Sequence, residues 1–177
     1  VAWQIIGKYP EWIMILEENV AKDNPITARF GGLDLLWANP LFLDPPETVK
    51  GEALIQTSEE GWLMKENFNT NPYQSQMFAM SKGQTQGQYV LGALLTGKFP
   101  SFFGEDKSEE TRMIVIGDAD FASNILQYSD SMYNVNFAKN VAEWLTNDDD
   151  LLEIRTRSTR DMRLNKIKDP EAKRRAF

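Results

Sequence analysis

The sequence predicts a layered α/β domain, and three observations favour this fold class. Several apolar runs have the length of strands, and one segment near the C-terminus has the spacing of an amphipathic helix. A strand, a polar turn, that helix and a further strand follow one another there. With 177 residues, 42% of them hydrophobic, the chain is long enough to bury a substantial core. The alternative is an α+β fold with a mostly antiparallel sheet.

Short apolar segments separated by turns fill the N-terminal part of the chain. Residues 12–16 (WIMIL) follow Pro10 and predict a buried strand. Residues 33–43 are interrupted at Asn39-Pro40, and proline cannot donate to a central ladder. This segment therefore predicts two short extended pieces around a bend. Residues 52–58 predict a further strand.

Stronger strand signals follow a long polar stretch. Residues 62–64 predict a short extended piece, and the Gly-, Gln- and Asn-rich residues 67–88 predict a long loop. Residues 89–99 predict a strand, and the charged residues 101–110 predict an exposed loop. Residues 112–117 (RMIVIG) form a continuous apolar run, which is typical of a central strand buried on both faces.

One amphipathic helix is expected at residues 134–146. Its apolar side chains recur at the spacing of a single helical face: Phe137, Val141, Trp144 and Leu145. Asn134 or Asn136 is suited to cap its N-terminus, because asparagine side chains accept hydrogen bonds from the first amides of a helix. Residues 151–154 predict a last short strand.

The composition excludes several kinds of chemistry. The chain has neither Cys nor His, so it lacks disulfides, zinc or iron sites with those ligands, and nucleophiles activated by His. It has no glycine-rich phosphate motif and no apolar run close to the roughly 20 residues that span a bilayer. We assign no catalytic residue, no metal ligand and no cofactor from these patterns.

Charge is distributed unevenly and divides the chain at residue 154. Residues 1–154 hold 23 acidic and 10 basic side chains, a net charge of −13. Residues 155–177 hold 3 acidic and 9 basic side chains, a net charge of +6, and the latter include Arg155, Arg157, Arg174 and Arg175. Anionic lipid headgroups attract such a tail. Nucleic acid is a poorer partner, because the acidic body repels a polyanion.

The best candidate for a chemical site is Asp118-Ala119-Asp120, directly after the apolar run at 112–117. Two carboxylates at the end of a strand could hold Mg²⁺ or Mn²⁺, or one could act as a general base. The structural alternative is that an aspartate fastens the following turn by accepting backbone amide hydrogen bonds. Separately, Trp37, Trp62 or Tyr73 could form a platform that binds glycans.

Residues 113–157 resemble the C-terminal part of an auxiliary domain of ABC-type transport systems, the gliding-motility-associated (GldG-like) family. The resemblance rests on IVIGDADFASN and on NVNFAKNVAEWLTNDDDLLEIR. The matching positions are Gly117, Asp118, Asp120, Phe121, Asn124, Asn136, Phe137, Asn140, Trp144, Leu145, Asp148, Ile154 and Arg155. Weaker matches are DNPIT at 23–27, the TS and WL pairs within 56–63, and GKFPS at 97–101. Ala119 replaces the usual serine.

The resemblance implies a Rossmann-like, glutamine-amidotransferase-like domain, related to the non-catalytic GIFT domain and lacking its first strands. It implies a non-enzymatic role, through the binding of a protein or a ligand, for a domain that lies outside the cytoplasm. The implied partners are an ABC permease and ATPase. Asp118, Asp120 and Asn124 would shape a loop at the sheet edge. Residues 1–154 would form the auxiliary domain, and 155–177 a membrane-proximal tail before a membrane-spanning helix.

Two other functions stay open at this point. One is a metal-dependent hydrolase built on Asp118 and Asp120, and the other is a glycan-binding module. The location is also in tension with the tail, because basic residues next to a membrane helix favour the cytoplasmic side.

Overall fold

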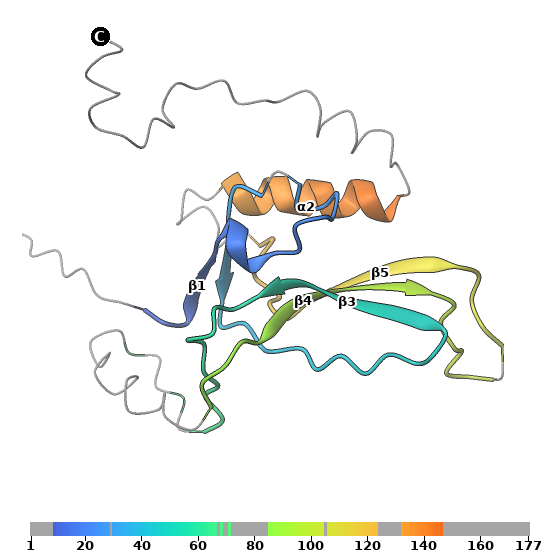
Figure 1. The fold of residues 1–177 in the computed structure, drawn as a ribbon, viewed down its shortest axis with the longest axis horizontal. Coiled ribbons are helices and arrows are strands. Elements are labelled where there is room, and N and C mark those ends of the chain that lie inside the picture. The colour runs from blue at the N-terminus through green and yellow to red at the C-terminus, as the bar shows by residue number, and fades with distance from the viewer. Residues whose placement is uncertain are drawn as a thin grey trace, which may run out of the picture.

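Two antiparallel sheets and one long helix make up the described part of the chain (Figure 1). The computed structural model describes residues 9–28, 30–66, 68, 71, 85–104, 106–123 and 132–146. The predicted strand at 151–154, the tail at 155–177, Tyr73, Asn124 and most of the expected loop at 67–88 lie outside these ranges.

The smaller sheet pairs β1 (Trp12–Ile15) with β2 (Leu33–Leu36). The short 3-10 helix η1 (Glu17–Asn19) lies in the connection between them. Leu33, Leu35 and Leu36 of β2 are buried, while Trp12 and Met14 of β1 are exposed. The predicted strand at 12–16 is thus confirmed, but only one of its faces is covered.

The larger sheet has the order β3-β4-β5, with bounds Val49–Gln56, Val90–Gly97 and Thr111–Ile116. The central strand is β4, and its Leu91, Ala93 and Leu94 are buried. The expectation that the run at 112–117 is a central strand covered on both faces is wrong. Among the described residues β5 pairs only with β4, and its Met113 is 44% exposed.

A local pattern could not have placed β5 correctly. Its alternate residues Ile114 and Ile116 pack against the core from one face. On the opposite face Met113 is 44% exposed, while Val115 is partly buried. An uninterrupted apolar run therefore indicated a strand, while the order of the described strands puts β5 at an edge.

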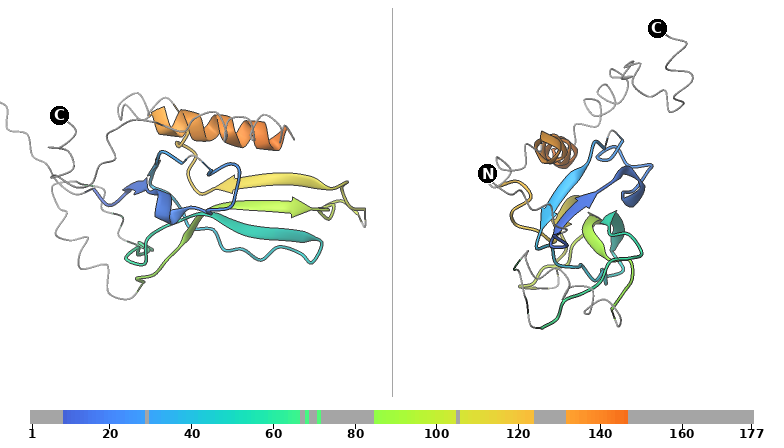
Figure 2. Two further views of the ribbon diagram at one scale, coloured as in Figure 1. Left: turned by 45° about the horizontal axis from the view of Figure 1, so that its top comes forward. Right: turned by 90° about the vertical axis from the view of Figure 1, so that its left-hand side faces the viewer.

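Helix α2 (Met132–Leu145) confirms the predicted helix and lies against β2 and β5, alongside the longer sheet (Figure 2). Its buried Phe137 meets Phe30 edge-to-face, with ring centroids 6.1 Å apart. The Arg112 guanidinium of β5 lies over the ring of Trp144, 4.6 Å from its centroid, and donates to the Trp144 carbonyl at 3.1 Å. A cation therefore sits at the C-terminal end of the helix, where it stabilises the exposed carbonyls.

A single hydrophobic core joins both sheets to the helix. Its buried members are Ile15, Val20, Ile26, Leu33, Leu35, Leu54, Ile55, Leu91, Leu94, Phe137 and Trp144. The fold is thus a mixed α and β domain whose strand pairs are all antiparallel within the described ranges, as in the alternative we considered. These residues do not show a Rossmann-like parallel sheet.

Candidate functional site

Asp118 occupies the turn directly after β5 and is 6% exposed. Its Oδ2 accepts a hydrogen bond from the Leu36 amide at the end of β2, at 2.7 Å. Its Oδ1 accepts one from the Asp120 amide at 2.6 Å, which closes the turn. The side chain therefore joins the end of one sheet to the end of the other. In this arrangement an aspartate stabilises a turn by accepting a hydrogen bond from the backbone amide two residues later.

The residue before Asp118 explains how the two sheets approach so closely. The Gly117 carbonyl accepts from the Asn39 amide at 2.7 Å, and its own amide donates to Leu91 at 2.8 Å. A Cβ added at Gly117 would lie 1.9 Å from the Asn39 carbonyl oxygen. Only glycine fits where the bend after β2 crosses the end of β5.

This geometry does not support a metal site at the Asp118-Ala119-Asp120 turn. Both oxygens of Asp118 already accept from backbone amides. Within the described ranges, no group of three or more His, Cys, Asp or Glu side chains could hold a metal ion. Asn124 and the basic side chains of Arg155, Arg157, Arg174 and Arg175 lie outside those ranges. Their roles stay predictions.

Asn134 is the residue that sequence reasoning assigned wrongly. It lies inside α2 and is fully buried, so it does not cap the helix. Its Oδ1 accepts from the Asp34 amide at 2.8 Å, and its Nδ2 donates to the carbonyls of Asp34 and Phe121, both at 2.7 Å. One amide side chain thus hydrogen-bonds the backbone of Asp34 in β2 and, through the Phe121 carbonyl, the segment after Asp118.

A signal for this role was present in the sequence. Members of the family that the sequence resembles have an N-x-x-F-x-x-N helix, and Asn134, Phe137 and Asn140 have this spacing, although the asparagine matched to the family above was Asn136. Residues three apart share one helix face. The structure shows Asn134 and Phe137 buried, with Asn140 donating to the Ile26 carbonyl at 3.1 Å, while Asn136 is exposed. An asparagine on the same helix face as a buried phenylalanine indicates a buried side-chain amide rather than a helix cap.

Two of the three aromatic residues predicted as a glycan platform come together. Trp37 and Trp62 line one hollow of about 200 Å³ beside the smaller sheet. Trp37 follows β2 and is 51% exposed, and Trp62 pairs with Gln86 in an isolated β-bridge. Trp62 also lines a second hollow of about 400 Å³ beside β1 and η1.

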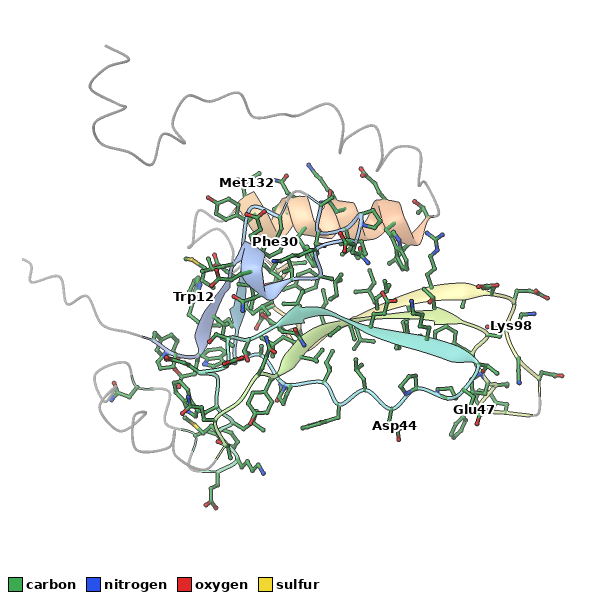
Figure 3. All side chains as sticks on the ribbon, in the orientation of Figure 1. Trp12, Phe30, Asp44, Glu47, Lys98 and Met132 are labelled. Atoms are coloured by element: carbon green, nitrogen blue, oxygen red, sulfur yellow. The ribbon has the colours of Figure 1, made fainter. Side chains whose placement is uncertain are left out.

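The hairpin between β4 and β5 ends in two exposed aromatic residues. Phe102 and Phe103 are 94% and 95% exposed, and their rings pack edge-to-face with centroids 5.3 Å apart. Lys98, at the base of this hairpin, and Trp12, on the smaller sheet, lie at opposite ends of the described part (Figure 3). We refer to residues 100–108 as the hairpin tip. No helix in the part of the chain that the structure describes is long and apolar enough to cross a membrane.

Comparison with known proteins agrees with the resemblance to a transport-related family. A family model described as an ABC-type uncharacterized transport system matches residues 5–152. An uncharacterized protein of Borreliella burgdorferi is 24% identical over 155 residues, which are 86% of this chain and 31% of that protein. The chain thus spans about a third of the length of this relative. No solved structure matches this chain. The chain belongs to the ABC-type uncharacterized transport system family, whose members are auxiliary components of such systems.

Proposed function

We propose that this chain is a non-catalytic auxiliary domain that acts through contacts with the permease and ATPase subunits of an ABC-type transport system. The observation that carries the non-catalytic role is the geometry of Asp118. The carboxylate best placed for chemistry has both oxygens engaged by backbone amides of the fold itself. Family membership supports the association with a transport system.

The hairpin tip is the surface best suited to such a contact. Exposed aromatic residues supply a large apolar area and are enriched at protein interfaces. The Ser101 amide donates to the Asp106 carbonyl at 2.8 Å, and the Ser108 amide donates to the Phe99 carbonyl at 2.9 Å. The backbone therefore already presents both rings, which reduces the entropy that ordering a loop on binding would cost.

Charge at the hairpin tip favours a protein pocket over a lipid surface. The tip holds two acidic side chains and one lysine, a net charge of −1, and Glu109 and Glu110 follow it directly. Anionic headgroups would repel this loop, whereas an apolar pocket with basic residues at its rim would attract it. We therefore place the contact with the permease at Phe102 and Phe103.

The test is co-purification of the full-length protein with the permease and ATPase of its own transport system. The double variant Phe102→Ser/Phe103→Ser should lose the complex, and the matched variant Phe42→Ser should retain it. Phe42 is a suitable control because it is 81% exposed and belongs to the connection between β2 and β3. Failure of the unchanged protein to associate with these subunits would refute the proposed function.

We further propose that the domain lies on the extracytoplasmic side, anchored by a segment beyond residue 177, and that the system is related to gliding motility. The resemblance to the gliding-motility-associated family supports both proposals, as well as a larger Rossmann-like fold that includes further strands. Because these 177 residues contain no cysteine, a Glu47→Cys variant can report the location when it is compared with the unchanged protein. A membrane-impermeant maleimide should label it in cells with an intact cytoplasmic membrane. Labelling only after lysis would place the domain inside.

A further inference from the structure

The strongest unexplained feature is a buried carboxylate beside the hollow near the smaller sheet. Both carboxylate oxygens of Glu11 are shielded from solvent and have no hydrogen-bond partner in the part of the chain that the structure describes. Glu11 contributes to the wall of the hollow. An unpaired buried carboxylate is unfavourable, because removal from water is not offset by a partner. A positively charged ligand would offset it.

Aromatic and sulfur-containing side chains form part of that wall, together with Pro10, Ile13, Ala38, Asn39, Pro40 and Leu63. Trp37, Trp62, Phe68 and Met64 line the same hollow as Glu11. The faces of tryptophan and phenylalanine rings carry partial negative charge and attract cations, with tryptophan the most effective. A carboxylate residue and aromatic side chains in the wall of one hollow are an arrangement that can bind organic ammonium groups.

Pairing of the two strands brings Glu11 and Trp37 together. Trp12 pairs with Leu36 in the β1–β2 ladder, and the Trp37 amide continues it by donating to the Glu11 carbonyl at 2.8 Å. Residues opposite each other across an antiparallel pair are neighbours in space. The indole Nε1 of Trp37 also donates to the Tyr9 hydroxyl at 3.2 Å. Both the backbone and the side chain of Trp37 are therefore held in place.

Trp37 holds this position in a strained backbone conformation. Its φ is +54°, in the left-handed region that bulky residues rarely adopt. Such strain persists only where surrounding contacts impose it, and it is concentrated at binding and active sites. Trp37 is nonetheless half-exposed, so burial of its own ring in the core does not explain the strain.

We propose that the hollow lined by Glu11, Trp37, Trp62 and Phe68 binds a small organic ammonium cation. The carboxylate supplies the counter-charge, and the aromatic faces exclude water and contact the cationic group. A volume of about 200 Å³ suits a head group of a few heavy atoms. A neutral sugar would stack on the same rings, but it would leave the Glu11 charge unbalanced. The site is at the end of the described domain away from the hairpin tip, and it does not depend on the proposed transport contact.

The first test compares ligands on the full 177-residue chain by calorimetry and tryptophan fluorescence. The probes are choline, tetramethylammonium, the uncharged choline analogue 3,3-dimethylbutanol, and glucose. Both cations should bind and change the fluorescence, and the uncharged analogue should bind at least about tenfold more weakly. Equal binding of the uncharged analogue would overturn the proposal, and so would binding of glucose without the cations. Absence of binding by both cations would overturn it too.

The second test removes the charge at the site. Glu11→Gln keeps the shape of the side chain and should weaken cation binding about tenfold or more. Glu17→Gln, an exposed substitution on η1, should leave cation binding unchanged. Cation affinity that is unchanged in Glu11→Gln would contradict the assignment, and the ligand comparison above stands even if that variant does not fold.

Discussion

Replacement of Asn134 by alanine should destabilise the fold by about 3 kcal/mol. The substitution removes three buried hydrogen bonds, to the amide and carbonyl of Asp34 and to the carbonyl of Phe121. Each such bond contributes about 1 kcal/mol net, and the backbone groups left behind gain no partner from alanine. The higher helix propensity of alanine recovers only about 0.5 kcal/mol.

Urea denaturation followed by circular dichroism measures this change. With a denaturant dependence of about 2 kcal/mol per M, the midpoint should fall by about 1.5 M in urea. Asn136→Ala is the matched control, because Asn136 is exposed on the same helix, two residues away. It should change the unfolding free energy by less than about 0.5 kcal/mol. A loss below about 1 kcal/mol for Asn134→Ala, or equal losses for both variants, would refute the reasoning.

Three further substitutions test the contacts that hold the sheets and helix together. Gly117→Ala should prevent stable folding or lower the free energy of unfolding by more than about 3 kcal/mol, since its Cβ would lie 1.9 Å from the Asn39 carbonyl oxygen. The melting temperature measures this loss. Asp118→Ala should lower the free energy of unfolding, measured by urea denaturation, by about 2–4 kcal/mol, because two backbone amides lose a charged acceptor. Asp120→Asn should lower it by less and should abolish no reaction. Arg112→Ala should cost about 1–2 kcal/mol, with a change in the near-ultraviolet circular dichroism of Trp144, and Arg112→Lys should recover part of the loss.

Local patterns in the sequence were sufficient to find most elements. The runs at 12–16, 52–58, 89–99 and 112–117 each overlap an observed strand, and the spacing from Phe137 to Leu145 located α2. Periodicity succeeds in these cases because each element presents one face to the core. The order of the short motifs was likewise enough to recognise the transport-related family.

The candidate site was less accessible to sequence reasoning. Asp118 stood out by its position after a strand, but its partner is the Leu36 amide, 82 residues earlier in the chain. Asn134 was interpreted as a cap because capping is the commonest local role of asparagine, and its partner at Asp34 is 100 residues away. Glu11 drew no attention, because an isolated glutamate next to a strand is ordinarily solvated.

The sequence by itself determined the identity of the elements, the family, and the absence of cysteine and histidine chemistry. These properties depend on residue type and on spacing along a few turns or strand residues. Only the tertiary structure decided that β5 lies at the edge of its sheet among the described strands, and that Asp118 and Asn134 serve the fold. It also brought Glu11, Trp37 and Trp62 to one hollow. The physical reason is that strand pairing and buried hydrogen bonds join residues far apart in the chain, and no local pattern specifies which distant group a polar side chain will meet.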